Sequence, residues 1–299
     1  MTSPDPSPAA DARPAASKVK RPWRTVPGVI RFIVRISVLG LWTGIVYVAI
    51  VCVAPFGLVS ATRCRKAQFA IARAWAHSVP RLLGLRVTVV GTPPSPPFLL
   101  VTNHLCWLDG FVTVEAVEPR FVAMAEAKGF FVVGTLMRAG RVIWADRSRS
   151  DEVPYLNDQM EQTMDEGHGV MFCPEGVVSP GRDVRRFRAA LLECAARSGR
   201  AVHYAAITYR TPEGYAPPSE AILFGPDPYY RTADGQIPES ELELWGPERS
   251  MFLYVVRLLS MPRYEAVITF GEEPIAGPDR ITLANALQAA VRGIFTPVE

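Results

Sequence analysis

A run of nineteen residues without a charge, ISVLGLWTGIVYVAIVCVA at 36–54, constrains the fold of this chain more than any other feature. As a helix it would extend roughly 28 Å, close to the thickness of a bilayer hydrocarbon core. We therefore expect an uncleaved membrane anchor, which either spans the bilayer or enters one leaflet. A signal peptide is the competing interpretation because Val59-Ser60-Ala61 loosely resembles a cleavage site, but the long basic segment before the run argues against it.

The charges are divided unevenly along the 299 residues. Residues 1–109 carry 13 basic and 3 acidic side chains, whereas the whole chain has a net charge of only +3. The front of the chain is therefore basic and the rest acidic, and so small a total does not indicate nucleic-acid binding. Five cysteines without C-x-x-C spacing predict neither a disulfide framework nor a structural zinc site, and they fit a reducing environment.

Composition divides the chain into three parts. Residues 1–25 are rich in Pro, Ala and Ser and predict a disordered basic tail. Residues 26–83 hold the anchor and then a helix over 62–83 that has one basic and one apolar face, which is typical of an interfacial helix beside anionic head groups. The alternative is that this helix packs on the body with its basic face in solvent. Pro80 should kink or end it.

Residues 84–299 alternate between strand and helix patterns, which favours an α/β domain. We predict a mostly parallel or mixed sheet flanked by helices and preceded by N-terminal membrane-associated helices. The expected strands are 87–90, 98–102, 120–124, 141–145, 170–172, 203–208, 221–224 and 265–270, and the expected helices are 105–117, 154–166, 184–198, 247–260 and 280–295.

Polar residues gather after three of these strands, at the edge where α/β sheets bind ligands. Asn103, His104 and Asp109 follow the strand expected at 98–102. A carboxylate that holds one nitrogen of an imidazole leaves the second nitrogen free to accept a proton. The alternative is that His104 caps a helix and Asp109 only satisfies its backbone. Asp146-Arg147 follow the strand expected at 141–145, and Pro174-Glu175-Gly176 follow the strand expected at 170–172.

Four arginines follow the strand expected at 170–172, and they predict an anion site at the start of a helix. A solvated helix face is the alternative interpretation. These residues are Arg182, Arg185, Arg186 and Arg188.

The three blocks, in this order, resemble the 1-acylglycerol-3-phosphate acyltransferase family of lysophospholipid acyltransferases. Asn103-His104-x4-Asp109 is similar to the first family motif, Gly140–Arg147 to the second and Phe172–Gly176 to the third, and the resemblance extends from about Phe98 to Tyr209. It implies transfer of a fatty acyl group from acyl-CoA or acyl carrier protein to the free hydroxyl of a lysolipid.

The resemblance also implies roles for individual residues. His104 and Asp109 would be catalytic, and Asn103, Arg147, Glu175, Gly176 and Arg182 would bind substrate. The expected partners are the lipid bilayer, the lysolipid acceptor and the acyl-CoA or acyl carrier protein co-substrate, with no cofactor, metal or nucleic acid. The expected location is the cytoplasmic face of the inner, or plasma, membrane.

Two departures from the family pattern bear on the chemistry. Cys106 stands where the first motif commonly has Ser, so a covalent cysteine route is an alternative to general base catalysis. Val177-Val178-Ser179 stands where the third motif often continues Thr-Arg-Ser, so either Arg182 or a neighbour takes over a phosphate contact, or the acceptor is lyso-ornithine lipid. Trp245-Gly246 and Pro262-Arg263 look similar to that second branch.

Two functions from other classes compete with acyl transfer. A metal-dependent hydrolase could use His104, Asp109 and Glu175 as ligands, but the chain has no second His at ligand spacing. A non-catalytic lipid-binding protein could keep the fold, although both His104 and Asp109 are intact.

Overall fold

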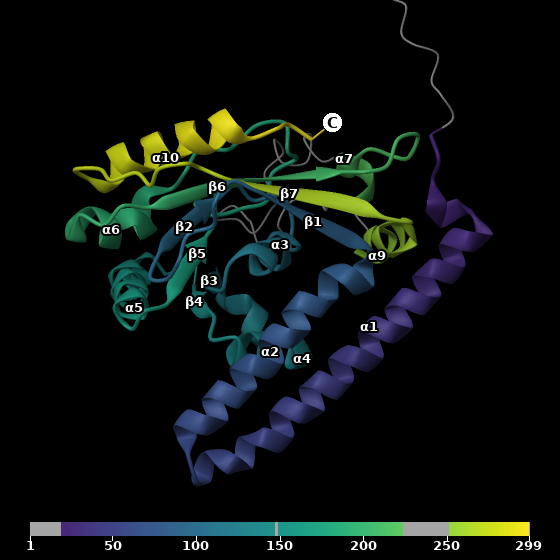
Figure 1. Cartoon of the computed structure of the whole chain (residues 1–299), viewed down its shortest axis with the longest axis horizontal. Helices are drawn as coiled ribbons and strands as arrows, with labels where there is room; N and C mark the ends of the chain where they lie inside the picture. The colour runs from purple at the N-terminus through teal and green to yellow at the C-terminus, as the bar shows by residue number, and fades with distance from the viewer. Residues whose placement is uncertain (1–18, 147–148, 224–250, 299) are drawn as a thin grey trace, which may run out of the picture.

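The computed structural model describes residues 19–146, 149–223 and 251–298. Its centre is a seven-stranded sheet in the order β1-β7-β6-β2-β5-β3-β4 (Figure 1). β6 and β7 pair antiparallel and the other neighbours pair in parallel, so the sheet of the described residues is mixed. The strands are β1 Leu85–Val90, β2 Leu99–Thr102, β3 Pro119–Met124, β4 Ile143–Ala145, β5 Gly169–Phe172, β6 His203–Arg210 and β7 Tyr264–Phe270.

Helices cover both faces of the sheet, which confirms the predicted α/β class. In Figure 1, α10 lies above the sheet, whereas α2, α3 and α9 lie below it. The α-helices are α1 Val26–Val53, α2 Ala61–Leu83, α3 Asp109–Ala116, α4 Phe131–Ala139, α5 Val153–Asp165, α6 Glu193–Ser198, α7 Pro218–Ala221, α9 Met251–Ser260 and α10 Arg280–Ile294. Short 3-10 turns are η1 Pro22–Arg24, η2 Ala54–Leu58, η3 Ala125–Gly129, η4 Ser150–Glu152 and η5 Ala189–Leu192.

Strand β2 separates two apolar cores and explains why its sequence is apolar without alternation. Leu99 and Val101 face the core shared with α5, α6 and α10, whereas Leu100 faces the core shared with α2, α3 and α9. All three side chains are fully buried. The residues that follow β2 are therefore held by a strand that is packed on both sides.

Helices α1 and α2 form a hairpin whose two ends both lie against the body (Figure 1). Trp42 donates a hydrogen bond to Ser78, and Trp75 donates one to Thr43, so side chains link the two helices. At the other end of α1, the Arg35 guanidinium donates to the backbone carbonyls of residues 259, 261 and 262. The chain therefore leaves the body along α1 and returns along α2.

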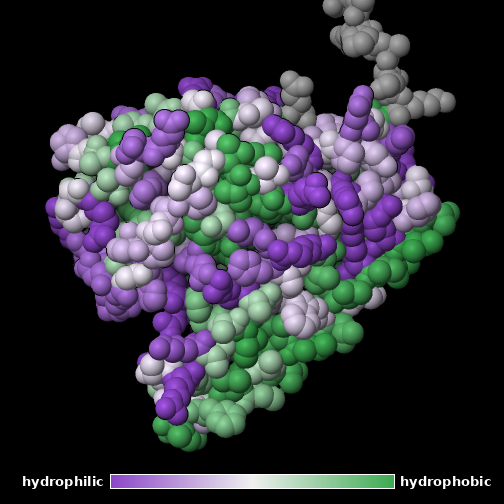
Figure 2. Space-filling model, viewed as in Figure 1, coloured by the Kyte–Doolittle hydropathy of each residue, from purple (hydrophilic) through white to green (hydrophobic). Residues whose placement is uncertain are grey.

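Helix α1 extends the apolar run predicted from the sequence and leaves much of it exposed. Within the described residues, one helical segment, Val26–Leu58, is long and apolar enough to cross a membrane, and 11% of its most apolar window is buried in protein. Figure 2 shows hydrophobic residues along α1 and at the hairpin tip. The tip itself exposes Phe56, Leu58 and Val59.

The basic face of helix α2 packs on the body near one end of the helix and is exposed near the other end. Near the body its basic face meets acidic side chains, since Arg73 pairs with Glu118 and Arg81 makes two 3.1 Å contacts with Glu115. Near the tip, Arg63, Arg65 and Lys66 are exposed. The helix continues through Pro80 and ends at Gly84, whose φ of +81° suits glycine.

Several boundaries differ from the sequence predictions. The strand expected at 221–224 is wrong, because Pro218–Ala221 form the short helix α7 and Phe224 lies outside the described residues. The helix expected over 184–198 begins as an extended loop, because the amide groups of Arg185 and Arg188 bond to the preceding turn through Glu175 and Pro174. The helix expected from Leu105 begins at Asp109.

Two further segments concern the predicted tail and helix α4. Residues 19–25 fall within the expected disordered tail, yet Lys20 bridges to Tyr215 and Arg21 pairs with Glu220. Residues 1–18 lie outside the described residues. Helix α4 has no counterpart among the predicted helices.

Candidate active site

The loop between β2 and α3 is wrapped around the carboxylate of Asp109. Its Oδ2 atom accepts the amide hydrogens of Leu105 at 2.7 Å and of Cys106 at 3.0 Å, and it lies 2.8 Å from His104 Nδ1. These bonds explain why helix α3 starts at Asp109, since the amides before it point to the side chain of Asp109. The five-residue spacing thus brings His104 and Asp109 together through a turn.

The second oxygen of Asp109 is bonded to a tyrosine that the sequence analysis missed. Tyr209, on β6, donates its hydroxyl hydrogen to Asp109 Oδ1 at 2.8 Å. Asp109 is 1% exposed, so its charge is held by these donors in an environment that excludes water. Tyr209 lies 100 residues from Asp109, and only its place in a buried strand marks it in the sequence.

His104 is oriented for proton transfer. In the neutral ring that donates from Nδ1 to Asp109, Nε2 carries no hydrogen and can accept one. The side chain is 24% exposed, so a substrate can reach it. Burial alone would lower the pKa of His104, but Cys173 and the bond to Asp109 outweigh burial and raise that pKa well above its ordinary value.

Glu175 fixes the backbone around His104. Its Oε1 atom accepts the His104 amide hydrogen at 2.9 Å, and Oε2 accepts the Arg185 amide hydrogen at 3.4 Å. The Ser179 amide donates to the His104 carbonyl at 2.8 Å. Burial raises the pKa of Glu175 to about 8, against the opposing effect of these donors. Glu175 therefore joins the first and third sequence motifs.

Asn103 and Cys106 are used inside the fold. The Asn103 side chain donates to the Ile207 carbonyl at 2.9 Å and accepts the Ile207 amide hydrogen at 2.7 Å, so it links β2 to β6. Cys106 is buried, its sulfur lies 4.0 Å from Asp109 Oδ1, and burial raises the pKa of its thiol well above the usual range. These contacts do not support a nucleophilic Cys106.

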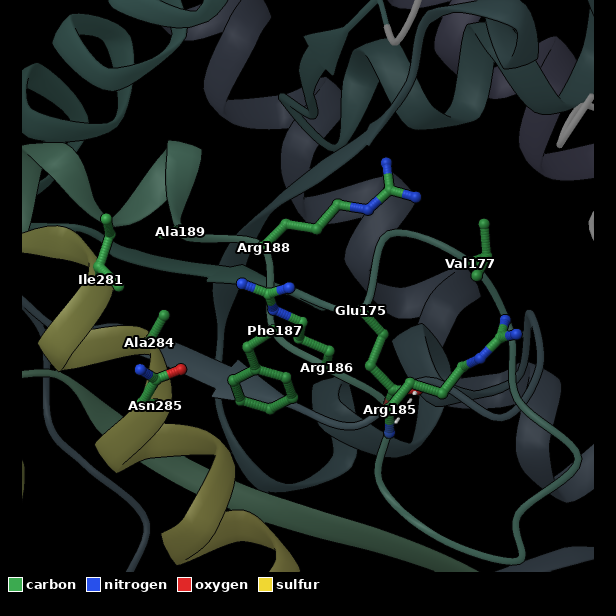
Figure 3. Close-up of a pocket in the computed structure, with 10 residues that line it drawn as sticks. All are labelled: Glu175, Val177, Arg185, Arg186, Phe187, Arg188, Ala189, Ile281, Ala284 and Asn285. Atoms are coloured by element: carbon green, nitrogen blue, oxygen red, sulfur yellow. Dashed lines mark hydrogen bonds between the residues drawn. The ribbon is translucent and has the colours of Figure 1, made fainter. Parts of the chain in front are cut away.

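A pocket of about 510 Å³ lies beside Glu175, between the arginine loop and α10 (Figure 3). In the figure, the three arginine side chains leave the loop in different directions, while Phe187 points toward α10. Arg186 and Arg188 are exposed, and neither has an acidic partner within the described parts of the chain. The pocket residues are Glu175, Val177, Arg185, Arg186, Phe187, Arg188, Ala189, Ile281, Ala284 and Asn285.

The remaining predicted binding residues have different placements. Gly176 has a φ of +74°, and a Cβ there would lie 3.2 Å from Arg188, so glycine leaves room for that side chain. Arg182 is exposed and does not line the pocket. Arg147 and Trp245-Gly246 lie outside the described residues, although Asp146 closes β4 at the same edge of the sheet.

The donor set does not favour the metal-dependent alternative. Both carboxylate oxygens of Glu175 accept backbone amide hydrogens, and Asp109 is surrounded by donors. Across residues 19–146, 149–223 and 251–298, no three His, Cys, Asp or Glu side chains are grouped as metal ligands.

A partly exposed imidazole, held by a buried carboxylate, lies beside a pocket lined by arginines, and this arrangement is suited to general base catalysis. Residues 86–208 match the Acyltransferase family model. This part of the chain is therefore similar to the acyltransferase family, and the resemblance predicted from the three motifs is confirmed.

Individual relatives agree with this assignment. Over 123 residues the chain is 31% identical to the 1-acyl-sn-glycerol-3-phosphate acyltransferase of Neisseria gonorrhoeae, a match that covers 40% of this chain and 48% of that protein. Over 146 residues it is 29% identical to the lyso-ornithine lipid O-acyltransferase of Brucella abortus, which covers 46% and 55%. The chain therefore spans about half the length of these curated relatives.

The fold is also similar to that of a solved structure. The crystal structure of the 1-acyl-sn-glycerophosphate (LPA) acyltransferase PlsC from Thermotoga maritima matches with a TM-score of 0.52 and 17% identity, and it covers 88% of this chain and 96% of that one. At this identity the likeness concerns the fold alone.

Proposed function

We propose that this protein is a membrane-attached acyltransferase that moves a fatty acyl group from acyl-CoA or acyl carrier protein to the hydroxyl of a lysophospholipid. The preferred acceptor is 1-acylglycerol-3-phosphate, which would become phosphatidic acid. The observation that carries the proposal is the 2.8 Å contact between His104 Nδ1 and the buried Asp109. It prepares the opposite ring nitrogen to remove a proton.

The reaction follows from this geometry. His104 Nε2 takes the proton of the acceptor hydroxyl as its oxygen attacks the thioester carbonyl carbon, and Asp109 stabilises the resulting imidazolium. The C–O bond forms, the C–S bond breaks, and the departing thiolate receives the proton from His104. The thioester is already activated, so no covalent enzyme intermediate is needed.

The arginine pocket is the proposed site for the acceptor head group. Glu175 lines this pocket and also bonds the His104 backbone, so an anion held there would lie beside the base. Arg186 and Arg188 are suited to a phosphate because guanidinium groups bind its oxygens in pairs. Arg188 would then supply the charge that the third motif lacks at Val178.

Lyso-ornithine lipid is the second candidate acceptor. It is favoured by the absence of an arginine directly after Glu175-Gly176 and by the relative from Brucella abortus that bears this activity in its name. The head group would still offer a carboxylate to the same arginines. The two candidates differ in the acceptor and share the base.

The hairpin of α1 and α2 is the proposed membrane attachment. Both ends of the hairpin lie on the body, and Arg35 ties the start of α1 to carbonyls near residue 260. This arrangement favours a hairpin that enters one leaflet over a single crossing. The proposed location is the cytoplasmic face of the inner membrane, where the thioester donors are found.

The proposal is tested by incubating the purified full chain with radiolabelled acyl-CoA or acyl carrier protein and a panel of lysolipids in detergent. We expect a labelled diacyl product, and His104→Ala should reduce its rate by about 10²–10⁴. An unchanged rate in His104→Ala would overturn the proposed base. Comparison of lysophosphatidic acid with lyso-ornithine lipid decides the acceptor, and absence of any acylated lipid would overturn the function.

A further inference from the structure

Helix α4 begins at an exposed apolar surface that the catalytic proposal does not use. Its inner side chains, Val132 and Leu136, join an apolar cluster with Val46 and Ile50 of α1. The amino-terminal end of α4 is exposed: Phe131 is 76% exposed, and Val133 and the preceding residue Phe130 are exposed as well. Adjacent exposed aromatic and aliphatic groups indicate a contact surface.

This surface is continuous with the exposed side of α1. The rings of Tyr47 and Phe131 lie 5.4 Å apart. Tyr47 lies twelve positions after Arg35, which is bonded to the body, and this separation corresponds to about 18 Å of helix. Phe131 therefore lies level with the exposed α1 residues Ile45 and Val48, well away from the tethered end of the hairpin.

The charges around this surface suit an anionic bilayer. Lys128 and Arg138 flank it in the sequence and are exposed. At the hairpin tip, Arg63, Arg65 and Lys66 are also exposed. Basic side chains beside exposed aromatic rings are typical of segments that lie at the head-group level of anionic bilayers.

Helix α4 also lies at the catalytic edge of the sheet. It follows β3 through η3, so it is attached to the carboxyl end of that strand. β2, β5 and β3 run in parallel, and His104 and Glu175 follow the carboxyl ends of β2 and β5. A surface that holds α4 would therefore hold the catalytic edge near it.

We propose that the exposed surface at the start of α4, formed by Phe130, Phe131 and Val133, is a second membrane contact that holds the body on a bilayer rich in anionic lipid. The inference rests on the proposed membrane attachment by the α1–α2 hairpin. It extends that attachment from the hairpin to the body and orients the acceptor site toward the lipid surface.

Photocrosslinking from position 131 tests the contact directly. We would replace Phe131 with p-benzoylphenylalanine in the full chain, bind it to vesicles of phosphatidylglycerol and phosphatidylcholine that contain labelled lipid, and irradiate. The matched control is the same replacement at Val90, which ends β1 at the opposite edge of the sheet. Val90 is 44% exposed, as Val133 is 43%. We expect lipid adducts from 131 and not from 90, and equal labelling at both positions would overturn the proposal.

A second measurement uses vesicle partitioning of Phe130→Ser/Phe131→Ser against Val89→Ser/Val90→Ser. We expect the first variant to lose about 10- to 100-fold in partitioning into anionic vesicles, because two aromatic side chains leave the lipid. The control should match the parent, and acyl transfer in detergent should be unchanged in both. Unchanged partitioning of the first variant, in a protein that Leu58→Asp releases from vesicles, would overturn the α4 contact. A chain that binds lipid through α4 without acylating any lysolipid would refute the proposed function alone.

Discussion

Asp109 and the arginine pocket lie on either side of Glu175, and they differ in whether the protein itself supplies partners for their charges. Asp109 is buried and accepts hydrogen bonds from Leu105, Cys106 and Tyr209 in addition to its bond with His104. Arg186 and Arg188, in contrast, extend into an open pocket without acidic partners among the described residues. Protein groups bond both oxygens of Asp109, whereas Arg186 and Arg188 have side chains available to bind an anion. The comparison shows that His104 and Asp109 are held in place by the protein itself, whereas the proposed head-group site leaves its arginines available for an anion.

The largest effect is expected from Asp109→Asn, which removes the charge that steers His104. We expect kcat to fall by about 10²–10⁴, because the neutral amide no longer stabilises the imidazolium. Since Asp109 helps to raise the pKa of His104, the acid limb of the pH–rate profile should also move to lower pH. Steady-state rates between pH 5 and 9 measure both changes.

In the parent, the bond to Asp109 helps to raise the pKa of His104 above its ordinary value, so the rate should rise with pH as the imidazole loses its proton. A variant whose acid limb stays in place while kcat falls would show that Asp109 does not set the charge of His104. Thermal unfolding of Asp109→Asn separates this result from simple loss of fold.

The next largest effect tests the other half of the comparison. Arg186→Ala/Arg188→Ala should raise KM for the acceptor by about 10- to 100-fold with little change in kcat, because each of these two exposed arginines would contribute roughly 1 kcal/mol to anion binding. The matched control is Arg182→Ala, which removes an exposed arginine that does not line the pocket.

Kinetics with varied acceptor and varied donor identify which substrate carries the anion. An increase in KM for acyl-CoA alone would assign the pocket to the donor phosphates. Unfolding temperatures should not change, since neither arginine pairs with an acidic side chain in the described structure. Equal effects of the double variant and Arg182→Ala would leave the pocket without a specific role.

Much of the fold could be predicted because most strands are short apolar runs that are buried on both sides of the sheet. Seven of the eight predicted strands differ from the structure by at most two residues at either end, and the strand expected at 221–224 is wrong. Helix α4 was missed because the residues that mark it, Val132 and Leu136, pack against α1, a contact that no local pattern reveals.

The site was predictable where its residues are close in sequence and not where tertiary contacts assign them. His104 and Asp109 share one turn, and their place after a strand, together with the resemblance to the first family motif, identified the pair. Tyr209 reaches Asp109 from β6, and Arg188 reaches Gly176 because the chain after the third motif stays extended. Residues 184–188 have a helical pattern but do not form a helix, because the amides of Arg185 and Arg188 bond to Glu175 and Pro174. A local sequence pattern does not reveal these hydrogen bonds.

A smaller effect is expected at Glu175, the residue between the two halves. Glu175→Gln keeps an acceptor for the His104 amide, so activity should remain within about tenfold of the parent, whereas Glu175→Ala leaves that amide unpaired and should lose more. Urea unfolding and acyl-transfer rates of the two variants at one pH provide the measurement.

The pH dependence of stability sharpens this prediction. The pKa of Glu175 is raised to about 8 in the folded protein, so its protonated form favours folding below the unfolded pKa near 4.3. That contribution is lost as pH rises toward 8, by at most about 1.4 kcal/mol for each pH unit. Glu175→Gln should remove this slope, and parallel stability curves for parent and variant would contradict the raised pKa.

The smallest effect is expected at Cys106, which lies inside the bonded environment of Asp109. Cys106→Ser should keep kcat within about threefold of the parent, because the thiol is buried, its pKa is raised and its sulfur faces Asp109. A hydroxyl at this position can still donate to the same carboxylate. Rates of the two proteins, with Cys173→Ala as the control for the half-buried thiol near His104, measure the effect. A loss beyond 100-fold in Cys106→Ser, with acyl label trapped on Cys106 of the parent, would replace general base catalysis with a covalent route. The buried surroundings of Asp109 would then contain the nucleophile.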